Sequence, residues 1–364
     1  MSRAPLLACA LLLAATGTAN AAGGTLVPPP GFTAPVAKAG GHSSHGCDAP
    51  PKPFTDDLDF PSKYEGSGKS RDTLNPKAEA KYKAMTEPIN DLEKEVSAMA
   101  ANYLHSGDPD QLKCVVDWLD SWAKADAMED RTRNHTGKSV RKWMLASIAS
   151  AWDRLKFSQS HPLDSADPAK VKDIENWFNK LGSLVYDDWR DQPLEKINNH
   201  HYWAAWAAMA DAVALNRRDL FDWSVSMYRT FANRQIDKDG FLPNELARDT
   251  RALNYHNYAL EPLTMIAAFA KANGVDLAPE GNNALSRLAV RTLAGVDDPS
   301  LFEGRTGSKQ ETDDLKEPER FAWLEPYCSL VDCSGDVGKR MNKLRPLKSH
   351  RMGGDLTEIF GRQN

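Results

Sequence analysis

Amides, imidazoles and aromatic rings are concentrated in residues 196–203, which read Lys-Ile-Asn-Asn-His-His-Tyr-Trp. A buried helix has little use for adjacent Asn and His pairs, because each buried polar group needs a hydrogen-bond partner. Asn199 can donate an amide hydrogen bond to a carboxylate, and His200 can donate one or act as a base near neutral pH. On a helix, Asn199 shares a side with Tyr202 and His200 shares a side with Trp203. The stretch predicts a site that holds a carboxylate.

A second polar run, residues 244–258, places one cation and two phenols on a common face. If it is helical, Arg251, Tyr255 and Tyr258 fall at i, i+4 and i+7 along roughly 10 Å. The planar guanidinium binds both oxygens of a carboxylate, and nearby positive charge favours a tyrosine phenolate as a base. Helical spacing allows either tyrosine in that role. A helix face packed against its neighbour is the alternative interpretation.

Basic residues follow a predicted loop-to-helix junction within residues 134–143. Lys138, Arg141 and Lys142 lie near the start of this helix, where cations oppose the helix dipole. The mismatch indicates a negatively charged ligand, and a solvated basic face is the alternative.

A flexible basic loop over residues 63–71 begins with Lys63 and Tyr64 and is expected to close over a bound chain. It lacks the G-x-x-x-x-G-K-[ST] spacing of a nucleotide-binding P-loop.

The elements that must position these side chains are helices. Apolar residues recur at helical spacing from residue 76 onward, and strand alternation is hardly visible. Asp-Pro pairs at 108–109 and 167–168 are helix starts. Further helices are expected at about 202–213, 220–233, 259–273 and 283–293. The pattern predicts one all-α domain over residues 22–364, an incomplete α/α toroid or barrel of helical hairpins, with residues 304–318 as a charged surface insertion.

The N-terminus has the features of a secretory signal over residues 1–21. Arg3 supplies the positive end, residues 6–15 are apolar but too short to span a bilayer, and Ala19-Asn20-Ala21 is a small-x-small cleavage site. Cleavage after Ala21 and export are therefore expected, with a membrane anchor as the alternative.

Cleavage would leave an even set of cysteines: Cys47, Cys114, Cys328 and Cys333. In an oxidising compartment this predicts two disulfides, for which three pairings exist. The short spacing favours Cys328–Cys333, and Cys47–Cys114 would then tie the N-terminal arm to an early helix. No C-x-x-C spacing supports a metal site. The formal net charge of −5 argues against nucleic acid and anionic membranes as partners.

Several motifs of the chain resemble those of the periplasmic alginate lyases of alginate-producing bacteria, the family-five polysaccharide lyases. They are residues 63–67 (KYEGS), 134–139 (NHTGKS), 196–200 (KINNH), 202–206 (YWAAW), 240–246 (GFLPNEL) and 255–260 (YHNYAL). The resemblance runs from about residue 26 to near the C-terminus. It implies an α/α toroid, a periplasmic location and mannuronate-preferring β-elimination without metal or cofactor.

The resemblance also implies roles for individual residues. Asn199, His200 and Arg251 would surround the uronate carboxylate at the cleavage subsite, and Tyr258 would be the catalytic phenol. The family has a serine where this chain has His201. Lys63 would lie in a mobile lid.

The expected partners are an anionic polysaccharide, alginate or polymannuronate, and proteins of alginate biosynthesis and export. Two other functions fit parts of the pattern: a glycoside hydrolase that uses Glu245 and Asp249, and a non-catalytic polyuronate-binding scaffold. The side chains expected to bind substrate are Lys63, Tyr64, Lys138, Arg141, Tyr202, Trp203, Arg248 and Tyr255.

Overall fold

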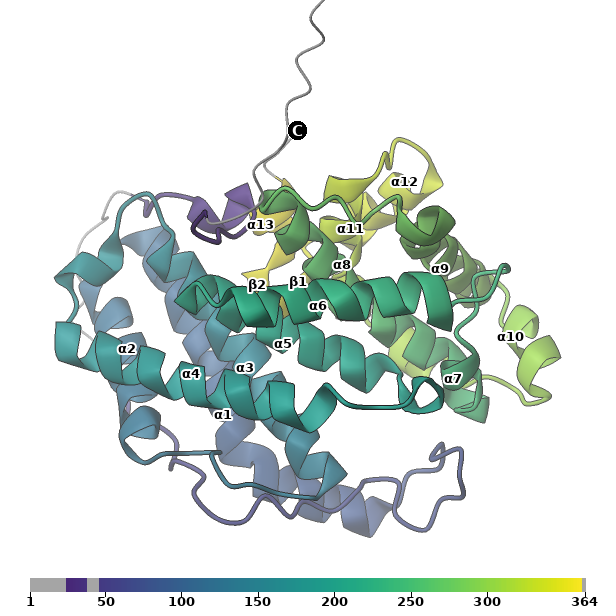
Figure 1. The fold of residues 1–364 in the computed structure, drawn as a ribbon, viewed down its shortest axis with the longest axis horizontal. Coiled ribbons are helices and arrows are strands. Elements are labelled where there is room, and N and C mark those ends of the chain that lie inside the picture. Colours follow the sequence, from purple (N-terminus) through teal and green to yellow (C-terminus); the bar gives the residue numbers. More distant parts are fainter. Residues whose placement is uncertain (1–23, 38–45, 362–364) are drawn as a thin grey trace, which may run out of the picture.

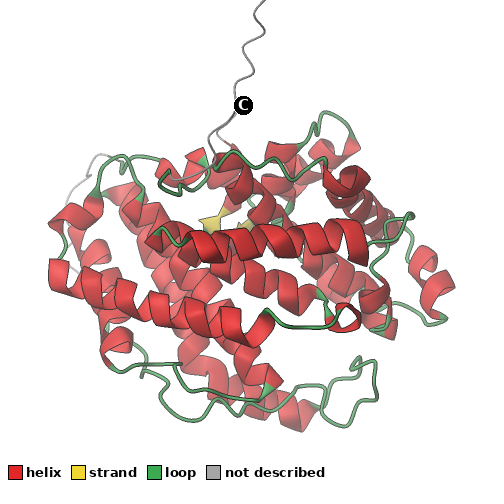
Figure 2. Ribbon diagram, in the orientation of Figure 1, coloured by secondary structure: helices red, strands yellow, loops and turns green. Residues whose placement is uncertain are grey.

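The computed structural model describes residues 24–37 and 46–361, and the expected signal peptide lies outside these residues. The described chain is mostly helical, with loops between the helices and almost no sheet (Figure 2). Its only strands form a two-stranded antiparallel ribbon near the C-terminal end, β1 (Lys348–Ser349) and β2 (Gly354–Asp355). The expectation of an all-α protein is confirmed.

The long helices form two layers built from consecutive hairpins. The inner helices are α1 (Pro76–Ser106), α3 (His135–Lys156), α5 (Asn199–Leu215) and α8 (Ala252–Ala272). The outer helices are α2 (Pro109–Lys124), α4 (Pro168–Trp189), α6 (Arg218–Thr230) and α9 (Glu280–Asp297). Each inner helix contacts the outer helix that follows it in the chain. Within the inner layer, α1 contacts α3, α3 contacts α5, and α5 contacts α8. In Figure 1, α4 and α6 cross in front of α3 and α5.

Shorter helical segments connect and cover these layers. The short α-helices are α7 (Pro243–Leu246), α10 (Ser300–Thr306), α11 (Leu324–Leu330), α12 (Asp336–Leu344) and α13 (Leu356–Gly361). The 3₁₀ turns are Pro30–Thr33, Pro162–Ser165, Leu194–Lys196, Asp249–Arg251, Asp313–Lys316, Pro318–Phe321 and His350–Met352, and Phe231–Gln235 is a π-helical turn.

Local sequence explains where the helices begin and which of them is central. The side chains of Asn75, Asp108 and Asp167 accept hydrogen bonds from the first backbone amides of α1, α2 and α4, each followed by proline at the first helical position. Helix α5 is apolar on nearly every side, which is typical of a helix surrounded by others. It contacts α3, α4, α6 and α8.

The C-terminal segment completes the ring. The turn His350–Met352 contacts α1, α3 and α8, the first and last inner helices among them. The arrangement confirms the predicted α/α toroid, and it brings a C-terminal residue, Arg351, against Glu93 of α1. No described helix is long and apolar enough to cross a membrane.

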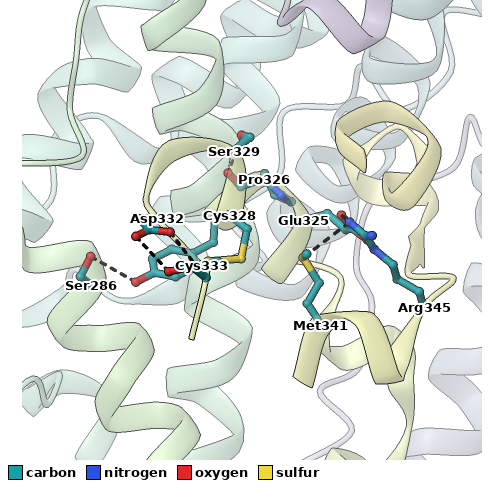
Figure 3. Close-up of a disulfide and its surroundings, with 11 residues drawn as sticks. Ser286, Glu325, Pro326, Cys328, Ser329, Asp332, Cys333, Met341 and Arg345 are labelled. Atoms are coloured by element: carbon teal, nitrogen blue, oxygen red, sulfur yellow. Dashed lines mark hydrogen bonds and ion pairs between the residues drawn. A yellow bond between two sulfur atoms is a disulfide. The ribbon is translucent and has the colours of Figure 1, made fainter. Parts of the chain in front are cut away.

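Both expected disulfides are present. Cys47–Cys114 joins the N-terminal arm to α2, with 5.3 Å between the Cα atoms. Cys328–Cys333 joins the last turn of α11 to the loop that follows it, and Figure 3 shows it beside the ion pair of Glu325 with Arg345.

Residues 304–318 are more than a surface insertion, which corrects that expectation. Part of α10 lies within them, and the buried Gln310 accepts a hydrogen bond from the backbone amide of Leu253 at 3.0 Å. Glu311 pairs with Arg251 at 2.6 Å. The segment therefore supports the start of α8.

Candidate active site

A cavity of about 590 Å³ opens at one end of the inner helices. Its walls come from residues 62–71, from α1, α3, α5 and α8, and from the turns after residues 313 and 349. The cationic side chains in its wall are Lys63, Lys69, Arg71, Lys83, Arg248, Arg251, Arg320 and Arg351, and the carboxylates are Glu261 and Asp314. Burial raises the pKa of Glu261 to about 8, so that side chain is largely neutral at pH 7. The cavity is suited to an anionic ligand.

The face predicted for residues 251–258 lines this cavity. Arg251, Tyr255 and Tyr258 are all wall residues, although α8 begins at Ala252 and Arg251 ends the preceding 3₁₀ turn. The Arg251 guanidinium donates to the carbonyl of Asp72 at 2.7 Å and pairs with Glu311. Its charge is therefore held at the cavity wall.

Tyr258 lies between an apolar wall and a cation. Its ring is 5.0 Å from that of Trp203, and burial raises the pKa of its phenol. Arg351 opposes this rise in the Tyr258 pKa through its charge and a hydrogen bond. Arg351 in turn donates to the buried carboxylate of Glu93 at 2.9 Å. The phenol therefore has a fixed positive neighbour.

The start of α5 carries the imidazole. The Asn198 side chain caps the helix by accepting from the backbone amide of His200, and His201 completes a capping box at the Asn198 backbone. His201 thus has a structural role at the start of α5. His200 is free of that role and lines the cavity. Burial and the adjacent Lys142 hold the pKa of His200 well below its usual range.

Asn199 does not line the cavity in this structure, although it was expected beside a ligand carboxylate. Its side-chain amide donates to both oxygens of Glu245, at 2.9 and 3.1 Å, and its backbone amide donates to the same carboxylate. Glu245 is buried and bound to Asn199 in this way, so it is not a cavity carboxylate. Asp249 is not among the residues that line the cavity either. This arrangement argues against the hydrolase alternative.

The basic loop covers one side of the cavity. The Tyr64 and Tyr255 hydroxyls are 3.0 Å apart, and the Arg248 guanidinium lies 3.7 Å from the Tyr255 ring centroid. Arg248 also donates to the backbone carbonyl of Ser70 at 2.7 Å. Exposed Lys63 is part of the same wall. Lys63, Tyr64, Arg248 and Tyr255 therefore lie together in one wall of the cavity.

Lys138 and Arg141 do not reach the cavity, which corrects their expected role. Both pair with Asp188 near the end of α4, at 3.1 and 2.9 Å. The buried Arg141 also donates to the carbonyl of Met128 at 2.8 Å. The anion that offsets this basic helix start is therefore a protein carboxylate.

Tyr202 and Trp203 are likewise core residues and not cavity residues. Tyr202 is buried against Phe231, and fully buried Trp203 supports the Tyr258 ring from behind. Both face inward because α5 is surrounded on all sides by other helices.

Several cavity residues have no signal in the sequence that indicates a site. Arg351, Arg320 and Tyr82 come from the C-terminal turn, the turn before α11 and helix α1. Lys142, which was one of the predicted basic residues, is buried behind the cavity wall and contacts His200. Closure of the helical ring assembles these positions. Within residues 24–37 and 46–361, no group of three or more His, Cys, Asp or Glu side chains is arranged to hold a metal.

Comparison with known proteins agrees with this fold. The alginate lyase family model matches residues 59–302. The chain is 54% identical to an alginate lyase of Pseudomonas syringae pv. syringae over 98% of this chain and 94% of that protein. It is 53% identical to an alginate lyase of Cobetia marina over 98% and 95%. A tyrosine-to-phenylalanine variant of alginate lyase A1-III, solved in complex with a tetrasaccharide, superposes with a TM-score of 0.75 at 25% identity over 87% of each chain. The chain belongs to the alginate lyase family.

Proposed function

We propose that the chain cleaves alginate at 4-O-linked β-D-mannuronate by β-elimination, which leaves an unsaturated uronate at the new non-reducing end. The observation that carries this proposal is the cation-lined cavity in which the Tyr258 phenol lies beside Arg351 and within reach of the same ligand as His200 and Arg251. A polyuronate is the polymer whose repeating carboxylates suit such a wall. The family relationship supports alginate as that polymer.

His200 and Arg251 are proposed to bind the uronate carboxylate. The proton on C5 is weakly acidic while this carboxylate carries its full charge. Donors that offset the charge stabilise the enolate-like species formed when the proton leaves, and each is typically worth several kcal/mol. Asn199 stays a predicted carboxylate ligand, and its binding to substrate requires its amide to leave Glu245.

Tyr258 is proposed as both base and acid. Its phenolate takes the C5 proton, the C4–O4 bond breaks as the C4–C5 double bond forms, and the phenol returns the proton to O4. In mannuronate the C5 proton and O4 lie on the same ring face, so one side chain can serve both transfers. Arg351 favours the phenolate that begins the cycle.

The test is ultraviolet absorbance over time with mature protein and polymannuronate, beside polyguluronate and with a chelator present. We expect absorbance to rise on polymannuronate and to survive chelation, as metal-free elimination requires. Tyr258→Phe should lower kcat by about 10³-fold or more. Tyr255→Phe, the matched control on the same face, should retain much more activity. A flat trace with confirmed polymer binding would leave the scaffold function instead.

We also propose that the chain acts in the periplasm after cleavage behind Ala21. The n-region, the short apolar run and the small-x-small site of the N-terminus support this proposal. N-terminal sequencing of the protein from a periplasmic fraction should begin at Ala22, and an intact Met1 would contradict it.

A further inference from the structure

Lys142 is a fully buried lysine that contacts the imidazole of the candidate site. Its Nζ atom lies 3.7 Å from the Trp189 ring centroid and 5.1 Å from that of Trp143. It is 3.0 Å from Nδ1 of His200 and 3.2 Å from the Ser139 hydroxyl. A lysine is seldom buried without a specific partner. The partners of Lys142 are the two tryptophan rings, the Ser139 oxygen and Nδ1 of His200.

The contacts around Lys142 favour one direction of hydrogen bonding. The Ser139 hydroxyl donates to the carbonyl of His135 at 2.9 Å, so its oxygen accepts from Lys142, and that oxygen also lies 3.2 Å from Nδ1 of His200. Burial holds the pKa of Lys142 well below its usual range, and its amine has N–H groups to donate whether or not it is protonated. Donation from Lys142 to Nδ1 of His200 leaves a neutral imidazole with its proton on Nε2. No described residue hydrogen-bonds Nε2, and His200 lines the cavity.

We propose that Lys142 is a positioning residue that keeps the ring proton of His200 on Nε2, the nitrogen available to the substrate carboxylate. This inference rests on the proposed function for the identity of that carboxylate. It makes His200 a hydrogen-bond donor and not the base that takes the C5 proton, because neither nitrogen then offers a free lone pair.

The charged surroundings of His200 work in the same direction. The titratable groups that face it are Lys142 and His135 from α3, Arg248 from the loop before α8, and His201 from its own helix. All of them oppose a second proton on the ring. His200 is therefore expected to remain neutral across the pH range in which the enzyme works.

The direct test is the tautomer of His200, read from two-bond ¹H–¹⁵N correlation spectra of ¹⁵N-histidine-labelled protein. The chain contains nine histidines, and the signal that disappears in His200→Gln assigns the residue. We expect a protonated Nε2 and a bare Nδ1 that persist below pH 6. A protonated Nδ1 in the unmodified protein would overturn the proposal whether or not the protein makes unsaturated product.

Three variants separate positioning from packing. Lys142→Met removes the donor and keeps the chain length, so Nδ1–H should appear and kcat should fall by about tenfold or more. The His200 titration should also move up toward its ordinary range. Lys142→Gln retains an N–H donor and should restore the Nε2–H form and much of kcat. Lys138→Met, on the same helix but outside the cavity, should leave the tautomer and the pH profile unchanged.

Several results would count against the inference. An unchanged tautomer and pH profile in folded Lys142→Met would make Lys142 a packing residue only. If Lys142→Met does not fold, the unmodified protein and Lys142→Gln decide the question. If the unmodified protein makes no unsaturated product, the proposed function fails, while the tautomer measurement still tests Lys142.

Discussion

At the scale of single residues, the phenol of Tyr258 depends on a charge from the far end of the chain. Burial alone would keep Tyr258 protonated at neutral pH, and Arg351 acts against that tendency. Arg351 is held in turn by Glu93, whose side chain is 1% exposed. Burial therefore outweighs the Arg351 charge at the proposed catalytic phenol, and contacts between α1, α8 and the C-terminal turn hold that charge in place.

Replacement of Arg351 should change the pH dependence of the reaction. Arg351→Gln removes the charge that lowers the Tyr258 pKa, so this pKa should rise further. Less phenolate would form at pH 7, and kcat should fall by about tenfold or more, with partial recovery as the pH increases. A pH profile of kcat on polymannuronate checks this. Arg340→Gln removes a surface ion pair with Asp297 and is the control. An unshifted profile in Arg351→Gln would contradict the assigned effect.

At the scale of elements, α3 and α5 each carry a buried carboxylate in the core. Asp153 and Asp211 are both 0% exposed, and none of their carboxylate oxygens has a hydrogen-bond partner among the described residues. Burial raises the pKa of both groups well above the usual range. These helices therefore pack best around neutral acids.

Stability should fall as the pH rises because of these groups. A raised pKa in the folded state means that the native protein binds more protons than the unfolded chain above about pH 4. The stabilising effect is complete below the unfolded pKa and is lost as the pH approaches the folded value. Asp211→Asn should therefore gain stability over the unmodified protein between pH 5 and pH 8, by about 1.4 kcal/mol or more. Urea unfolding at both pH values measures this change.

The matched control for Asp211 is Asp219, at the start of α6. Arg217 holds the pKa of Asp219 below its ordinary value. The ionised Asp219 therefore stabilises the folded protein at every pH above its unfolded pKa. Asp219→Asn should for this reason gain no stability over the unmodified protein at pH 8. A stability difference for Asp211→Asn that stays constant from pH 5 to pH 8 would show that Asp211 is ionised in the folded protein.

At the scale of the whole molecule, the chain carries a net negative charge, whereas its cavity is lined mainly by cations. The formal net charge is −5, and the cations gather where the helical ring opens. Electrostatic attraction of a polyanion must therefore be local, and it must weaken as salt screens the wall.

Salt should raise KM more than it changes kcat. Between about 0.01 M and 1 M ionic strength the Debye length falls from about 30 Å to about 3 Å. Attraction from cavity cations should weaken over that range, whereas contacts within the closed site are screened much less. Initial rates on polymannuronate at several NaCl concentrations measure both constants. A KM that does not respond to salt would argue against electrostatic capture.

The local sequence determined which chemistry is available and which elements carry it. Helical periodicity predicted the layers, because a helix repeats its inward face every few residues. The same spacing placed Arg251, Tyr255 and Tyr258 on one wall. Cysteine spacing favoured the two disulfides that are present. The choice of Tyr258 over Tyr255 came from family resemblance and stays a prediction.

Only the tertiary structure decided which polar residues reach the cavity. Asp188 holds Lys138 and Arg141, and Glu245 holds Asn199, across contacts that no local pattern encodes. Arg351 reaches the site only because the C-terminal turn closes the ring. Lys142 contacts His200 across 58 positions of sequence. A local pattern specifies the face of one helix, whereas the partner of a buried charge is specified by the helices that pack against it.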